Sequence, residues 1–314
     1  MNFRPYTSRR RSEPNMSGRA SLYVAIVAAI LFACAAFLWL HFRGGSEQPV
    51  VSFTPIAHAT EPSKESPAEH SGTAAAGQPA EPSAKKPAPP PEPAFLPQPG
   101  EDLQFAASLA KVGNVASLRL QVVEKKESNG KPEWHFQATA KTQNAMRLIF
   151  ELDDRFDSFS EGNSFTGVQY EMHLSERGQK VQSIQHLTAT GKEPPPPGTS
   201  AAVVLPGTRD PLGMMQYLRS VNWDATREVK SPVFDGRKLY DVRAKLIGTS
   251  EVAVPAGRYT AATIDVRVFD NGAEMKDAHF TLYLAHDAAR TPVLLLAVLP
   301  FAEARVELQP KGGE

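Results

Sequence analysis

Apolar and polar residues alternate along most of the second half of the chain. Between Gly100 and Pro310, apolar side chains recur at every second position in runs separated by short polar turns. A period of two with one apolar face predicts antiparallel β-strands that are packed on one side and hydrated on the other. The alternating runs are residues 103–109, 116–122, 134–140, 168–174, 240–246, 262–268, 280–284 and 302–308. Residues 293–299 form an unbroken apolar run, which predicts a strand covered on both faces.

Turn sequences separate these runs. Asn129-Gly130 stands between two alternating runs and is a strong hairpin signal. Asp235-Gly236 and residues 255–257 also predict tight turns, in which glycine supplies a positive φ.

Two stretches have helical spacing. Residues 144–152 are apolar and predict a short helix, and residues 210–221 predict a longer one. Asp210 can cap the first free amides of the longer helix, and Pro211 suits its first turn. Its apolar positions are Met214, Met215, Leu218 and Val221.

These elements predict a mostly β fold. About ten alternating strands tend to curl and need an element that covers the inner face. We therefore expect a large curled antiparallel sheet or half-barrel with one covering helix.

A long apolar run lies near the N-terminus. It begins at Leu22 and ends at Leu40, and its nineteen residues contain no charge, no proline and no glycine. A helix of this length matches the ~30 Å hydrocarbon core of a membrane. The preceding residues hold Arg4, Arg9, Arg10, Arg11 and Arg19 against one acid, Glu13. Basic residues beside a span stay in the cytoplasm, so the sequence predicts a cytoplasmic N-terminus and a periplasmic β domain.

A cleaved signal peptide is the alternative for this run. Ala57-His58-Ala59 fits a cleavage site, but it lies far beyond Leu40, and the run exceeds the roughly 7–15 apolar residues of a signal peptide. We therefore expect a retained signal-anchor that binds the inner membrane. The single cysteine, Cys34, lies within the span, so the β domain can form neither a disulfide nor a thiolate metal site.

Proline dominates the next segment. Thirteen of the 27 prolines lie in residues 43–99, among Ala, Glu, Ser and Lys. Such a segment holds too few large apolar groups to offset the entropy of ordering, so it predicts a disordered spacer. The predicted order is a basic cytoplasmic tail (residues 1–21), a transmembrane signal-anchor helix (22–42), the linker (43–99), the β domain (100–309) and a flexible tail (310–314).

Composition and motifs indicate no chemistry. The formal net charge is zero, which favours no nucleic acid partner. No two of the eight histidines are spaced i, i+2 or i, i+4, and neither a nucleophile elbow nor a phosphate-binding loop occurs. Asp153, Asp154 and Asp157 are interpreted as solvated acids of a turn. We therefore predict no catalytic residue, no cofactor and no metal site.

Several short motifs in the β region occur in the order found in a known family. They are PGEDLQF from Pro99, YLR from Tyr217, FDGRKLYDV from Phe234, VPAGRY from Val254, AHD from Ala285 and RTPV from Arg290. Over residues 99–309 the chain thereby resembles the bacterial family known as domain of unknown function 3108. The closing motif departs from the family's pattern because no Trp occurs near Tyr283. The resemblance implies a secreted or envelope β domain without an established activity, and it carries over no catalytic residue.

Four polar residues of this region, Asp210, Arg219, Asp235 and Asp287, have expected structural or functional roles. Asp210 is predicted to cap the helix, and Asp235 to form a turn with Gly236. Arg219 is expected on the exposed face of the covering helix, where it can pair with Asp287 or Asp241.

Three functions are compatible with this organisation. The first is an inner-membrane-anchored periplasmic protein whose β domain binds a lipid, a polymer or an envelope protein partner without catalysis. The second is a TonB-like scaffold or energy-coupling element, because such proteins also have an N-terminal anchor and a Pro-rich spacer. The third is a hydrolase whose site forms only through tertiary contacts, around His135, His173 or His279.

Overall fold

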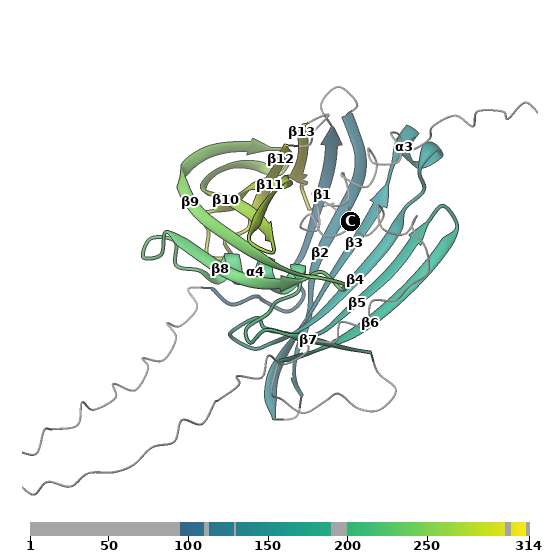
Figure 1. Cartoon of the computed structure of the whole chain (residues 1–314). Helices are drawn as coiled ribbons and strands as arrows, with labels where there is room; N and C mark the ends of the chain where they lie inside the picture. The colour runs from purple at the N-terminus through teal and green to yellow at the C-terminus, as the bar shows by residue number, and fades with distance from the viewer. Residues whose placement is uncertain (1–94, 110–112, 129, 190–199, 299–302, 312–314) are drawn as a thin grey trace, which may run out of the picture. The chain divides into compact units, whose positions relative to one another are not determined.

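Thirteen strands and two helices form the described part of the chain (Figure 1). The computed structural model describes residues 95–109, 113–128, 130–189, 200–298 and 303–311. The predicted basic tail, membrane span and nearly all of the linker, residues 1–94, lie outside the described residues. The elements are β1 (Asp102–Leu109), β2 (Gly113–Ser128), β3 (Lys131–Thr142), α3 (Asn144–Ile149), β4 (Asp153–Glu161), β5 (Gly167–Glu176), β6 (Gln179–Ala189), β7 (Ala201–Val204), α4 (Pro211–Ser220), β8 (Glu228–Phe234), β9 (Leu239–Val254), β10 (Gly257–Asp270), β11 (Ala273–Ala285), β12 (Pro292–Val298) and β13 (Glu303–Leu308).

All thirteen strands belong to one sheet. Its order is β7-β6-β5-β4-β3-β2-β1-β13-β12-β11-β10-β9-β8, so two meanders, β1 to β6 and β8 to β13, meet where β1 pairs with β13. Neighbouring strands are antiparallel except for β6 and β7, which are parallel. The predicted curled antiparallel sheet is thus confirmed as a mostly β, nearly closed, barrel-like sheet, with one parallel pair that the sequence did not predict.

The segment before α4 connects β5 to β8, the strand at one edge of this sheet. Arg209 forms a parallel bridge with Val233 of β8, and its backbone N–H donates to the carbonyl of Pro232 at 3.0 Å. On the other side, the N–H of Gly167 in β5 donates to the carbonyl of Thr208 at 2.9 Å. Two consecutive residues therefore link β5 to β8, although β7 and β8 are not themselves paired in the described strand order.

Most local predictions are confirmed. Strands cover the nine predicted apolar runs, and Gly130 turns between β2 and β3 with φ +72°. The interpretation of Asp153, Asp154 and Asp157 as acids of a solvated turn is wrong. They lie on β4, and both Asp154 and Asp157 are buried.

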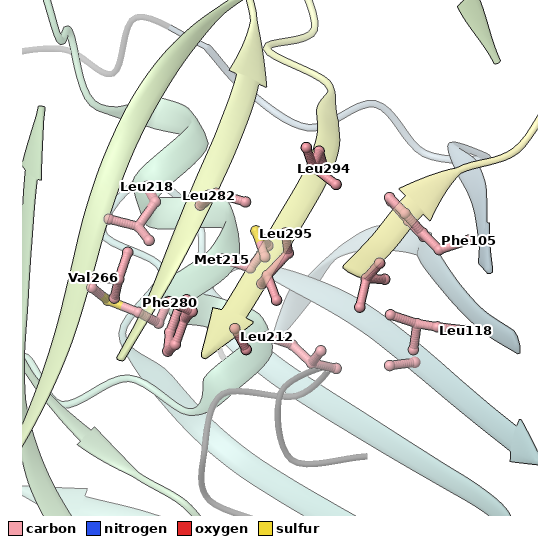
Figure 2. Packing of buried hydrophobic residues seen from close by; sticks show 14 of the residues in the cluster. Phe105, Leu118, Leu212, Met215, Leu218, Val266, Phe280, Leu282, Leu294 and Leu295 are labelled. Carbon is pink, nitrogen blue, oxygen red and sulfur yellow. The ribbon is translucent and has the colours of Figure 1, made fainter. Parts of the chain in front are cut away.

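Helix α4 lies within the curl of the sheet. Nine of its ten residues are buried, and it packs against β3, β4 and β8. Figure 2 shows its side chains Leu212, Met215 and Leu218 in one cluster with apolar residues of β10 to β12. The predicted longer helix is confirmed as α4, which packs against the inner face of the sheet, and the predicted short helix is present as α3. Among the described residues, no helix has both the length and the apolar character needed to cross a membrane.

Gly213 permits α4 to approach β4 closely. A Cβ at this position would lie 2.8 Å from the carbonyl oxygen of Phe165 and 3.0 Å from the Oγ of Ser160. Real Cβ atoms are not found at the first distance, so only glycine fits at this point without a shift of the helix.

Candidate functional site

Asp210 caps α4 from a position with no exposed surface. Its Oδ1 accepts hydrogen bonds from the backbone N–H groups of Leu212 at 2.9 Å and Gly213 at 3.0 Å. Its Oδ2 accepts from the Oγ of Ser158 on β4 at 2.7 Å. The predicted cap is confirmed. Burial raises the pKa of Asp210 to about 6, against the opposing effect of these hydrogen bonds.

The expected exposure and partners of Arg219 are wrong. The residue is only 1% exposed, and its guanidinium forms two parallel hydrogen bonds of 2.7 Å to the carboxylate of Glu101. It also donates to Gln216 Oε1 at 2.9 Å and to the carbonyl of Ala289 at 2.8 Å. Arg219 therefore ties α4 to the residue that precedes β1 and does not reach the solvent.

Asp235 and Asp287 stabilise turns. Asp235 is buried before β9, where its Oδ1 accepts from the backbone N–H groups of Arg237 and Lys238 at 2.8 and 2.7 Å. This confirms the predicted turn, and burial raises the pKa of Asp235 to about 6. Asp287 accepts from the backbone N–H and the hydroxyl of Thr291 at 2.9 and 2.7 Å. These contacts are local, so neither residue adds to a shared site with Asp210 or Arg219.

Polar side chains converge instead on the face of β3, β4 and β5 that is opposite the core. In the strand register, Asp157 of β4 pairs with Gln137 of β3 on one side and with Glu171 of β5 on the other. His135 is two residues from Gln137 on β3, and His173 is two residues from Glu171 on β5. Residues two apart on a strand project from the same face, so both histidines lie on the face of Asp157. We call these five residues, His135, Gln137, Asp157, Glu171 and His173, the outer polar cluster.

Asp157 is the centre of this cluster and is 4% exposed. Its Oδ1 accepts from His135 Nε2 and Gln137 Nε2, both at 2.8 Å. Its Oδ2 lies 2.9 Å from Arg155 Nε and 3.9 Å from His173 Nε2. Burial raises the pKa of Asp157, but the hydrogen bonds from His135 and Gln137 and the charge of Arg155 outweigh it, so the pKa is lowered overall. The cluster thus keeps a buried carboxylate ionised at neutral pH.

Glu171 and His173 complete the cluster on β5. The Oε2 of Glu171 lies 3.1 Å from His173 Nε2, and its Oε1 accepts from Gln169 Nε2 at 2.5 Å. Beside them, the ring of His135 stacks on Phe159 with 4.5 Å between centroids. The cluster therefore offers oriented carboxylates, imidazoles and amides, which are groups that bind a polar ligand or a cation.

Sequence reasoning missed this cluster because it missed β4. The inward positions of β4 are Asp154, Phe156, Ser158 and Ser160, so only one of the four is apolar and the alternation was hidden. A weak signal did exist in Glu171-Met172-His173. On a strand, this spacing places the carboxylate and the imidazole on one face.

Comparison with known proteins gives a family and a general architecture. The model of the family described as "Protein of unknown function (DUF3108)" matches residues 104–309. No curated protein matches the chain.

Three solved structures are similar to the chain. A β-barrel-like protein of the domain of unknown function DUF1849 from Brucella abortus is 12% identical and has a TM-score of 0.44, over 67% of this chain and 95% of that one. A candidate lipoprotein from Parabacteroides distasonis is 10% identical with a TM-score of 0.33, over 70% and 98%. A candidate exported protein with a YmcC-like fold from Bacteroides fragilis is 9% identical with a TM-score of 0.29, over the same shares. Identities this low carry no information about ligand or activity.

Proposed function

The chain belongs to the DUF3108 family of proteins of unknown function, and from this premise we propose that it is a non-enzymatic binding protein of the bacterial envelope. The run from Leu22 to Leu40 anchors it in the inner membrane, and the linker holds the β domain in the periplasm. The domain binds a polar envelope partner, a polymer or a protein, through the outer polar cluster.

The packed interior of the sheet is the reason to place the binding site on the outer face. A carrier of acyl chains needs an apolar cavity that encloses its ligand. Here α4 occupies the curl of the sheet, and its apolar side chains pack with those of β10, β11 and β12 (Figure 2). This packing favours a partner on the outside of the sheet over a lipid within it.

The surroundings of the histidines favour binding over hydrolysis. His135 and His173 contact Asp157 and Glu171, and His279 contacts Asp265 at 2.5 Å. A hydrolase with a serine nucleophile needs a hydroxyl within hydrogen-bond reach of the imidazole. Among the described residues, the side-chain hydrogen bonds of these three histidines run to carboxylates instead.

Site-specific photo-crosslinking in living cells tests the binding surface. A photoreactive residue would replace Thr139, which lies on the same face beside the cluster, and Lys245 on β9 would serve as an exposed control position. We expect adducts from position 139 and none from position 245. Equal crosslinking at both positions would contradict the proposal.

A reporter fusion tests the location. Alkaline phosphatase fused after Glu314 is active only if the C-terminus reaches the periplasm. We expect an active fusion that stays with the inner membrane, and activity of a cytoplasmic reporter at the same position would refute the predicted orientation.

A further inference from the structure

We propose that Asp157, Glu171 and His173 bind a divalent transition-metal ion such as Zn²⁺ on the outer face of β4 and β5. Their ligand atoms lie within 4.8 Å of one another. This site does not depend on the envelope partner proposed above, although the ion would lie on the same face. It also replaces the expectation, drawn from the sequence, that the chain has no metal site.

The distances between the three ligand atoms suit a small ion. His173 Nε2 lies 3.1 Å from Glu171 Oε2 and 3.9 Å from Asp157 Oδ2. Two ligands of a tetrahedral zinc ion, each about 2.1 Å from the metal, are about 3.4 Å apart. Small side-chain rotations would bring all three atoms to bonding distance, because no two of them lie more than 4.8 Å apart.

Neighbouring side chains orient both carboxylates for this role. His135 and Gln137 occupy Oδ1 of Asp157, and Gln169 occupies Oε1 of Glu171. The other oxygen of each carboxylate is thereby left facing His173. Hydrogen bonds that hold metal-ligating carboxylates in this way are a regular feature of metal sites.

The Oδ2 atom of Asp157 is a second observation that favours a cation site. It is buried and accepts no hydrogen bond, which is uncommon for a buried carboxylate oxygen. Arg155 Nε lies 2.9 Å away in an ion pair without hydrogen-bonding geometry, and the Arg155 side chain is 49% exposed. A cation already stands at this atom, and its exposed side chain can move aside when a metal ion replaces it.

The donor set selects the class of metal. An imidazole nitrogen with two carboxylate oxygens suits Zn²⁺ and similar divalent transition ions. Ca²⁺ and Mg²⁺ prefer all-oxygen sites with six or more ligands, so they should bind weakly here.

A second His–Asp–Arg group in the same sheet provides a matched control. Asp265 of β10 contacts His279 of β11 at 2.5 Å and Arg267 Nε at 2.8 Å, much as Asp157 contacts His135 and Arg155. Glu274, the nearby second carboxylate, pairs with Arg267 instead of the imidazole. Among the described residues, three donors converge only around Asp157.

Titration of the untagged full-length chain in detergent tests the site. After chelator treatment, ZnCl₂, MgCl₂ and CaCl₂ would each be added in a calorimeter, and Co²⁺ would be followed by its visible absorption. We expect one Zn²⁺ site that is lost, or weakened at least ~100-fold, in Glu171→Gln and His173→Gln, because each loses a direct ligand. His279→Gln should bind Zn²⁺ as the unchanged chain does.

Two outcomes of the Zn²⁺ titration would refute the proposed site. Absence of Zn²⁺ binding by the unchanged chain, or equal affinity in Glu171→Gln, His173→Gln and His279→Gln, would refute it. Thermal unfolding of the metal-free variants shows whether each is folded. Should one unfold, the Co²⁺ spectrum of the unchanged chain decides, since an octahedral aqua-ion spectrum contradicts ligation by His173.

Discussion

Two consecutive residues of β4 serve opposite regions of the molecule. Ser158 faces inward and donates to Asp210 at the buried start of α4, whereas Asp157 faces outward into the outer polar cluster. Both aspartates are at most 4% exposed. Burial raises the pKa of Asp210 to about 6, but the pKa of Asp157 is lowered despite burial.

Asp210 is the more deeply buried of the two carboxylates, and the two also differ in their partners. Asp210 accepts hydrogen bonds from uncharged groups, the two backbone amides and the hydroxyl of Ser158. Asp157 accepts side-chain hydrogen bonds from His135 and Gln137, and the positive charge of Arg155 beside it further favours the ionised form. The inner region therefore serves stability, while the outer region holds a charge that a ligand can use.

Among the substitutions considered, Arg219→Met should lower the free energy of unfolding most. Arg219→Met leaves the carboxylate of Glu101 without its forked partner, and removal of one member of a buried ion pair costs about 3–5 kcal/mol of the free energy of unfolding. Urea denaturation of the full chain measures this loss. The double variant Glu101→Gln/Arg219→Met should recover part of it, and an unchanged midpoint in Arg219→Met would show that the pair does not hold α4.

Adding a methyl group at Gly213 should cause the next largest loss of free energy of unfolding. Gly213→Ala forces a Cβ against the carbonyl oxygen of Phe165, and such overpacking costs about 1–3 kcal/mol. Gly248→Ala on β9 is the matched control, because no atom lies within 4 Å of its added Cβ. Equal denaturation midpoints for the two variants would contradict the close packing of α4 on β4.

The pH dependence of stability should differ in sign between the two aspartates. The folded pKa of Asp210 is about 6 against an ordinary value of 3.8, so its contribution to the free energy of unfolding falls as pH rises from about 4 to 6. The folded pKa of Asp157 is lowered, so its contribution is present above pH 4 and is lost in more acidic solution.

Asparagine variants measure these contributions. Asp210→Asn keeps an oxygen that can accept from Leu212 and Gly213, so it should remove the fall between pH 4 and 6 at little cost to the helix cap. Asp157→Asn should be less stable than the unchanged chain above pH 4 and should approach it in acid. If the free energy of unfolding depended on pH in the same way in both variants, the proposed difference between Asp210 and Asp157 would be wrong.

The smallest effect on stability is expected at Glu171 and His173. Both contribute partly exposed side chains to the outer face, and metal-free Glu171→Gln and His173→Gln should lie within about 0.5 kcal/mol of the unchanged chain in urea denaturation. A loss as large as that of Gly213→Ala would show that the outer polar cluster stabilises the fold instead of serving a ligand.

Local features were predictable from the sequence because neighbouring residues decide them. Alternation predicted eight of the thirteen strands, an unbroken apolar run predicted a ninth, β12, and Asp210-Pro211 predicted where α4 begins. Asn129-Gly130 predicted the hairpin between β2 and β3. Side-chain spacing and backbone preference within about ten residues are enough for each of these features.

Only the tertiary structure decided which distant groups meet. Glu101, the partner of Arg219, is 118 residues away in the chain, and the pairing of β1 with β13 depends on the curl of the whole sheet. The outer polar cluster likewise needs three strands in one register before Asp157, Glu171 and His173 become neighbours. No local pattern encodes such contacts, because they result from the packing of segments whose own sequences do not specify their partners.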